Sequence, residues 1–167
     1  MSGEERIGYL GLGSNVGDRA AHLRAAPPLL EEQGVSVTAA SSLYETDPVG
    51  PITDQPDFLN AALRVQTTLE PQQLYEACKA IEIEQGRIFA GPRQGPRSLD
   101  IDLLLLGDIE LETERLTLPH AGVTSRRFVL VPLLEIEPGL RLPDGTSLAE
   151  TLEALGPGER VERVEPL

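Results

Sequence analysis

The stretch GPRSLDIDLLLLG, residues 95–107, places two acids at the entrance of the most hydrophobic segment of the chain. Four consecutive leucines are typical of a strand that is buried on both faces. Residues i and i+2 of a strand point to the same face, so the side chains of Asp100 and Asp102 should share a face about 7 Å apart. Two ionised carboxylates at that separation repel by about 2 kcal/mol at an effective dielectric constant of about 20. The pair therefore needs a protonated acid, a neighbouring arginine or bound metal ions.

These solutions predict different roles for the acid pair. An arginine such as Arg97 would make the two acids a structural feature of the strand entrance. Hard cations that are bridged by two carboxylates and a polyphosphate would make them a catalytic site. Arg87, Arg93 and Arg97 lie in the glycine- and proline-rich loop just before the strand. Guanidinium groups bind phosphate oxygens in bidentate fashion, so this loop favours the metal and polyphosphate interpretation.

A second basic cluster, formed by His120, Arg126 and Arg127, lies downstream in a chain that is acidic overall. The chain has 14 Lys and Arg against 27 Asp and Glu, which gives a net charge of −13. This balance argues against electrostatic capture of nucleic acid. The turn GSNVGDR at residues 13–19 lacks both the P-loop and the dinucleotide-binding patterns, so it predicts only a strand-to-helix turn.

Length and composition predict one cytoplasmic domain. The chain has 167 residues, of which 40% are hydrophobic, enough to form a core without disulfides. Its single cysteine, Cys78, excludes an intrachain disulfide. No apolar run approaches the roughly 18 residues of a spanning helix, and the N-terminus lacks the apolar region of a signal peptide. We therefore expect no association with membranes.

Hydrophobic patterns predict strands that alternate with helices. The strands are expected at 6–12, 35–44, 59–69 and from Asp100 onward, with a short extended piece at 115–118. Residues 128–136 fit either a helix or a strand.

Three further segments carry helix signals. A first helix should begin near Asp18 and kink or end at Pro28, which has no backbone donor. A second, at 71–85, has proline at its first position and Gly86 after its end, and it should place Cys78 in the core. Ser147 with Glu150 predicts a capping box for a last helix that ends at Gly156.

The resulting β-α-β-β-α-β order predicts a single α+β domain with a ferredoxin-like core, in which helices pack on an antiparallel sheet. The domain would span residues 1–167, with its core at about 6–156 and an acidic C-terminal tail beyond. The loops at 47–57 and 86–97 are long for a compact domain, and such loops are usually functional. We therefore expect them to belong to an active site.

Segments spread along the chain together resemble the 6-hydroxymethyl-7,8-dihydropterin pyrophosphokinase family of folate biosynthesis. The segments are GLGSNVGDR, SSLYETDPVG, DQPDFLNAAL, IEIEQGR, GPRSLDIDLLLLG, and LTLPH followed by RRFVLVPL. They follow the family's order from about residue 6 to about residue 140. The resemblance implies a magnesium-dependent, monomeric enzyme that transfers the β,γ-diphosphate of ATP to the pterin hydroxymethyl group and releases AMP.

The resemblance also implies a role for individual residues. Asp100 and Asp102 would hold two Mg²⁺ ions, and Arg87 and Arg97 would act with them in catalysis. The pterin would contact Thr46, Pro48, Val49, Asn60 and Asp100 and lie between the rings of Phe58 and Phe128. ATP would contact Glu82, Leu103, Arg115, Thr117, His120 and Arg126. A flat heterocycle favours aromatic faces with a few fixed hydrogen bonds, which agrees with this placement.

Two other classes of protein fit parts of the pattern. A palm-like nucleotidyl transferase or cyclase also sets two carboxylates on a ferredoxin-like sheet, although the net charge disfavours one that handles nucleic acid. A regulatory small-molecule-binding module of ferredoxin-like type has no need for Asp100, Asp102 and the arginine loop together. Formation of AMP from ATP and the pterin discriminates the pyrophosphokinase from both.

Overall fold

A computed structural model describes residues 4–47, 56–86 and 98–167 of the chain. The strands are β1 (Arg6–Ser14), β2 (Ser36–Ala40), β3 (Ser42–Thr46), β4 (Phe58–Thr67), β5 (Asp100–Leu106), β6 (Leu111–Glu112), β7 (Thr117–Leu118) and β8 (Val161–Pro166). The helices are α1 (Arg19–Glu32), α2 (Pro71–Glu84), α3 (Arg127–Ile136), α4 (Leu148–Leu155) and the short 3₁₀ turn η1 (Ala121–Thr124). Every helix in this part of the chain is too short or too polar to span a bilayer.

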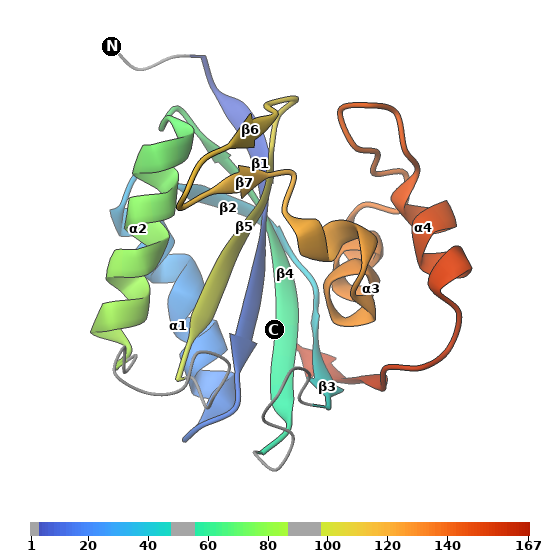
Figure 1. Ribbon diagram of the computed structural model, residues 1–167. Helices are drawn as coiled ribbons and strands as arrows, with labels where there is room; N and C mark the ends of the chain where they lie inside the picture. The colour runs from blue at the N-terminus through green and yellow to red at the C-terminus, as the bar shows by residue number, and fades with distance from the viewer. Residues whose placement is uncertain (1–3, 48–55, 87–97) are drawn as a thin grey trace.

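One antiparallel sheet of six strands organises the fold (Figure 1). Its strand order is β5-β1-β4-β3-β8, and β2 also pairs with β4. The order β5-β1-β4-β3 sets the last core strand beside the first, as in the split βαβ arrangement. The predicted α+β class with a ferredoxin-like core is therefore confirmed.

The sheet is covered on both faces, with α1 and α2 on one side and α3 and α4 on the other (Figure 1). The leucines of β5 contribute to both cores: Leu103 and Leu106 pack with α1 and α2, whereas Leu104 and Leu105 pack with α3 and α4. This two-sided burial explains the uninterrupted apolar run after Asp102. It also makes β5 a firm support for the two acids at its entrance.

The first helix was predicted to kink or end at Pro28; α1 does not end there, because it continues to Glu32. Proline in a helix interior removes a hydrogen bond and costs about 3 kcal/mol. Here the helix buries Leu23, Ala26 and Leu30 completely, so its packing extends past the proline. Its start near Asp18 is confirmed, since the Asp18 carboxylate accepts a hydrogen bond from the Ala21 amide at 3.1 Å.

The single strand predicted at 35–44 is instead two strands, β2 and β3, separated at Ser41. The Ser41 amide donates to the Ala62 carbonyl at 2.9 Å, while the Ala62 amide donates to the Ser41 hydroxyl at 2.8 Å. A side-chain oxygen thus replaces one backbone partner and interrupts the ladder. The ambiguous segment at 128–136 is helical and forms α3.

The expected ends of α2 and α4 are confirmed. Gly86 follows α2 with a φ of +89°, and Gly156 follows α4 with a φ of +68°, a region that glycine enters without strain. Ser147 accepts from the Glu150 amide at 3.3 Å. Strand β8 had no sequence prediction, because it lies in the acidic tail beyond residue 156, and it extends the sheet along β3.

Cys78 is a core residue, as its position on α2 predicts, and burial raises the pKa of its thiol to about 12. The thiolate is the reactive form of cysteine, and a raised pKa leaves the group protonated at pH 8. We therefore expect the native protein to react with a chromophoric disulfide at least about 100-fold more slowly than the unfolded protein at pH 8. Comparable rates with and without denaturant would contradict the buried position.

Candidate active site

The two acids of β5 lie opposite glycines of β1. Asp100 pairs with Gly13 and Asp102 pairs with Gly11 across the antiparallel ladder. Glycine has no side chain, so the space beside each carboxylate stays open. Both acids line the same cavity, of about 180 Å³, as expected for residues i and i+2 of one strand.

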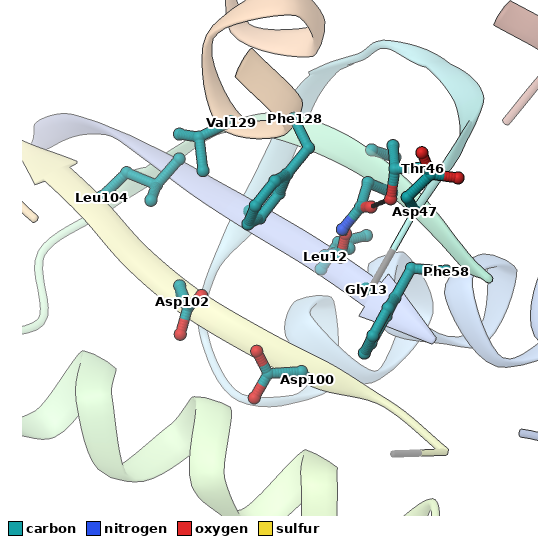
Figure 2. A pocket seen from close by; sticks show the side chains of 13 residues that line it. Leu12, Gly13, Thr46, Asp47, Phe58, Asp100, Asp102, Leu104, Phe128 and Val129 are labelled. Atoms are coloured by element: carbon teal, nitrogen blue, oxygen red, sulfur yellow. Dashed lines mark hydrogen bonds between the residues drawn. The ribbon is translucent and has the colours of Figure 1, made fainter. Parts of the chain in front are cut away.

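Aromatic rings and a buried polar pair complete this first cavity. Phe58 of β4 and Phe128 of α3 project into the same hollow, and Asp100 and Asp102 lie across from them on β5 (Figure 2). At its floor the Thr46 hydroxyl donates to the Asn60 side-chain oxygen at 2.5 Å. The cavity is lined by Gly11, Leu12, Gly13, Thr46, Asp47, Phe58, Asn60, Ala61, Asp100, Asp102, Leu104, Phe128 and Val129. This set suits a flat, mostly apolar ligand with a few polar edges.

A second cavity, of about 330 Å³, lies on the side of β5 that faces α2 and β7. It is lined by Tyr75, Lys79, Ile101, Asp102, Leu103, Glu114, Arg115, Leu116, Thr117, His120 and Ala121. The lining combines the basic groups of Lys79 and Arg115 with the acids Asp102 and Glu114 and with apolar surface, so it can contact both an anionic group and a flat ring. Asp102 lines both cavities and therefore stands where they meet.

Lys79 brings a positive charge to the second cavity. Its ammonium lies 3.1 Å from Glu82 Oε2. Burial opposes that charge, but the Glu82, Asp100 and Asp102 carboxylates outweigh it and raise the pKa of Lys79 above its ordinary value. Lys79 therefore stays protonated at neutral pH and offsets part of the negative charge at the entrance of β5.

His120 enters the same cavity as a neutral ring. Its Nδ1 accepts a hydrogen bond from the Gly122 amide at 2.9 Å, which leaves Nε2 as the protonated nitrogen. Burial lowers the pKa of His120, an effect that Asp100 opposes and Lys79 reinforces. The ring can therefore donate one hydrogen bond from Nε2 to a ligand.

The structure brings together most of the predicted site residues that it describes. Thr46, Phe58, Asn60, Phe128 and both acids line the first cavity, and Leu103, Arg115, Thr117 and His120 line the second. Glu82 lies beneath β5 instead, fully buried, where its Oε2 accepts from the Ile101 amide at 2.7 Å. Arg126 pairs with Glu159 at 3.1 Å. Pro48, Val49, Arg87, Arg93 and Arg97 lie outside the described residues.

Several lining residues had no sequence prediction, above all Gly11, Gly13, Asp47 and Lys79. The glycines carried a usable signal, because two glycines at i and i+2 inside a strand indicate that another group approaches the backbone closely. Asp47 and Lys79 carried none, since their positions depend on the pairing of distant segments.

The fold and the site together define an α+β protein of the phosphoryl-transfer type, with an acid pair between an aromatic cavity and a second cavity that carries Lys79 and Arg115. A family model described as 7,8-dihydro-6-hydroxymethylpterin-pyrophosphokinase (HPPK) matches residues 9–138, and the chain belongs to this family. The family predicted from the sequence is therefore confirmed. Pyrophosphate transfer to hydroxymethyldihydropterin, the predicted function, is the activity of this family.

Bacterial relatives match nearly the whole chain. The 2-amino-4-hydroxy-6-hydroxymethyldihydropteridine pyrophosphokinase of Pseudomonas aeruginosa is 44% identical over 157 residues, which cover 93% of this chain and 95% of the relative. The protein of the same name from Methylorubrum extorquens is 48% identical over 158 residues, which cover 94% and 98%. The match to these relatives extends along almost their full length.

Solved structures agree with the fold. A Plasmodium falciparum HPPK-DHPS, crystallised with pterin and p-hydroxybenzoate, superposes with a TM-score of 0.71 at 18% identity. The superposition covers 90% of this chain and 44% of the longer chain. At that identity, the likeness supports the fold alone.

Proposed function

We propose that this chain transfers the β,γ-diphosphate of ATP to the hydroxymethyl group of 6-hydroxymethyl-7,8-dihydropterin, releasing AMP, in a magnesium-dependent reaction. The observation that carries the proposal is the position of Asp102, which lines both cavities. The pterin occupies the aromatic cavity, and ATP occupies the second cavity, which carries Lys79 and Arg115. The hydroxyl and the β-phosphorus then meet beside the acid pair, as an in-line transfer requires.

The acid pair fits magnesium. Mg²⁺ usually binds through one or two carboxylates together with substrate phosphates and water. Asp100 and Asp102 supply such a pair. Among the described residues, no group of three or more Asp, Glu, His or Cys side chains forms a larger metal site. Asp100 and Asp102 would hold the two ions, which when bound neutralise phosphate charge and polarise the phosphoryl oxygens.

The other residues bind and orient the two substrates. The rings of Phe58 and Phe128 enclose the pterin, and Asn60 and Thr46 meet its polar edge. Arg115, Thr117 and His120 position the nucleotide, with Leu103 against its flat base. Glu82 and Arg126 were also predicted to contact ATP. Glu82 accepts from the Ile101 amide of β5, and Arg126, at the start of α3, pairs with Glu159.

Two arginines of the loop before β5 complete the proposal. Arg87 and Arg97 stabilise the charge that develops on the phosphates, and Pro48 and Val49 add backbone contacts to the pterin. Guanidinium groups suit the first task, because each can bind two phosphate oxygens at once. These four assignments rest on the family resemblance.

The proposal also covers the domain extent, the oligomeric state and the location of the protein. We infer a single pyrophosphokinase domain over residues 1–167 that acts as a cytoplasmic monomer, with ATP and the pterin as its partners. The net charge of −13 supports the exclusion of nucleic acid. Sedimentation at micromolar concentration tests the monomer, and a dimer would contradict it.

The direct test combines the purified protein with ATP, Mg²⁺ and the hydroxymethyl dihydropterin. Chromatography should detect AMP and the pterin diphosphate in equal amounts, and chelation of magnesium should stop both. A reaction without the pterin controls for simple ATP hydrolysis. A folded protein that forms no AMP would contradict the proposed activity. Turnover in the presence of a chelator would contradict only the magnesium requirement.

Gly13 provides a test of the pterin cavity. A Cβ at this position would lie 2.9 Å from Asn60 Nδ2, which is held in place because it donates to the Leu12 carbonyl at 3.2 Å. Overpacking of this kind costs about 1–3 kcal/mol, so we expect Gly13→Ala to raise the KM for the pterin about tenfold. The KM for ATP should stay within about twofold, as steady-state kinetics with each substrate varied would show.

Gly11→Ala is the matched control for this substitution. Its Cβ would meet Leu104 at 3.4 Å, an ordinary contact, so the rise in the pterin KM should be smaller. Equal effects of the two substitutions, or an effect mainly on ATP, would contradict the position assigned to the pterin.

A further inference from the structure

We propose that Arg160 is a positioning residue for the pterin cavity, an inference that rests on the proposed function. Arg160 lies just before β8 and contacts three carboxylates. Its Nε lies 2.9 Å from Asp47 Oδ1, its Nη2 lies 2.5 Å from Asp57 Oδ2, and its Nη1 lies 2.9 Å from Glu162 Oε1. One guanidinium group therefore bridges acids from three separate segments of the chain.

Two of these acids flank residues that line the cavity. Asp47 follows Thr46 at the end of β3, and Asp57 precedes Phe58 at the start of β4. Thr46 and Phe58 are direct partners in the ladder between these strands. Thr46, Asp47 and Phe58 lie together on one side of the hollow (Figure 2). The guanidinium group of Arg160 thus fixes the spacing between the end of β3 and the start of β4, which form this side of the cavity.

Other contacts hold the backbone of the same strand end. Asn15 Nδ2 donates to the Pro56 carbonyl at 3.0 Å, and Arg19 Nη1 donates to the Asp57 carbonyl at 3.0 Å. Arg19 also pairs with Glu45 of β3 at 2.6 Å. These contacts should keep the strand end folded without Arg160, which is the residue that joins Asp57 to Asp47.

Removal of the guanidinium would leave the carboxylates of Asp47, Asp57 and Glu162 facing one another. Like charges at close range repel, and the repulsion is partly screened because these side chains are 41–64% exposed. We expect the strand ends to shift apart and displace Phe58 and Asp47 at the cavity wall. Small displacements of binding groups weaken positioning without unfolding the protein.

A purely structural role in holding β8 would predict a different result. The strand is already anchored by backbone pairing with β3 and by Arg24, which pairs with Glu165 at 2.7 Å and donates to the Leu167 carbonyl at 3.0 Å. Arg160 also lies beyond residues 9–138, the region that the family model matches. The contact between Arg160 and the cavity wall therefore belongs to the C-terminal segment, which the family model does not cover.

The test compares steady-state kinetics of Arg160→Met and the wild type, with each substrate varied in turn. Methionine keeps the aliphatic stem and removes the charge. We expect the KM for the pterin to rise about five- to tenfold, with kcat and the KM for ATP within about twofold. Arg160→Lys should restore only part of the affinity, because a single ammonium cannot hold two acids as a fork does.

Arg24→Met is the matched control, because it removes an ion pair of β8 in which neither residue lines the cavity. It should leave the pterin KM unchanged. Equal rises in pterin KM for the two variants would overturn the positioning role. An unchanged pterin KM in Arg160→Met would also overturn the positioning role. In that case an active wild type would still support the proposed function. An inactive wild type would overturn both.

Asp57→Asn provides a second measurement. Alone, it should raise the pterin KM in the same direction as Arg160→Met. Combined with Arg160→Met, it should add less than its single effect, because the two residues act through one contact. Fully additive effects would show that Arg160 does not act through Asp57 and would overturn the proposed bridge.

Discussion

Replacing Asp100 or Asp102 by asparagine is expected to lower kcat by about 1,000-fold or more, because each carboxylate would bind magnesium where the two cavities meet. Asparagine keeps the shape of the side chain and removes the negative charge. The free energy of unfolding should change by less than about 1 kcal/mol, since the loss of repulsion between the acids offsets lost contacts. Initial rates and thermal unfolding of each variant provide the two measurements.

Asp108→Asn is the control for this pair. Asp108 is exposed beyond the opposite end of β5, so its substitution should leave the rate unchanged. Near-full activity in either Asp100→Asn or Asp102→Asn would remove that residue from the proposed magnesium site. A large loss of stability in either variant would make its rate uninformative about catalysis, and alanine at the same position would then separate the two effects.

Glu82→Ala is expected to lower the free energy of unfolding by about 3 kcal/mol. Its carboxylate is fully buried, accepts from the Ile101 amide at 2.7 Å and pairs with Lys79 at 3.1 Å. Truncation would leave the buried Ile101 amide without its acceptor, between the two acids of the proposed magnesium site. Urea denaturation should show a lower midpoint with an unchanged m value.

Two variants of α2 calibrate this result. Glu82→Gln keeps an acceptor for the Ile101 amide and should cost about 1 kcal/mol. Glu84→Ala removes an exposed acid from the same helix and should change stability by less than about 0.5 kcal/mol. If Glu82→Ala proved as stable as Glu84→Ala and raised only the KM for ATP, nucleotide contact would be the main role of Glu82.

Local signals in the sequence account for the elements that were predicted correctly. The bounds of α2 follow from Pro71 and Gly86, and the two-sided burial of β5 follows from its leucine run. The common face of Asp100 and Asp102 follows from the two-residue period of a strand. Each of these conclusions depends on neighbours in the chain and needs no knowledge of the tertiary structure.

Features that depend on distant partners were missed or predicted wrongly. Helix α1 continues past Pro28 because burial of Leu30 outweighs the local preference against proline. The break at Ser41 depends on Ala62, a residue of another strand. Strand β8 exposes most of its side chains and so lacks the hydrophobic alternation of a half-buried strand. Its place beside β3 is visible only in the folded sheet.

The glycines of β1 also bear on inhibition of the enzyme. At Gly13 the wall of the aromatic cavity is main chain, and no substitution can remove main-chain atoms from beneath a bound compound. Any added side chain would begin 2.9 Å from Asn60 Nδ2 and would crowd the proposed pterin site along with the inhibitor. A drug that rests on this wall would therefore leave the organism few resistance mutations that preserve turnover.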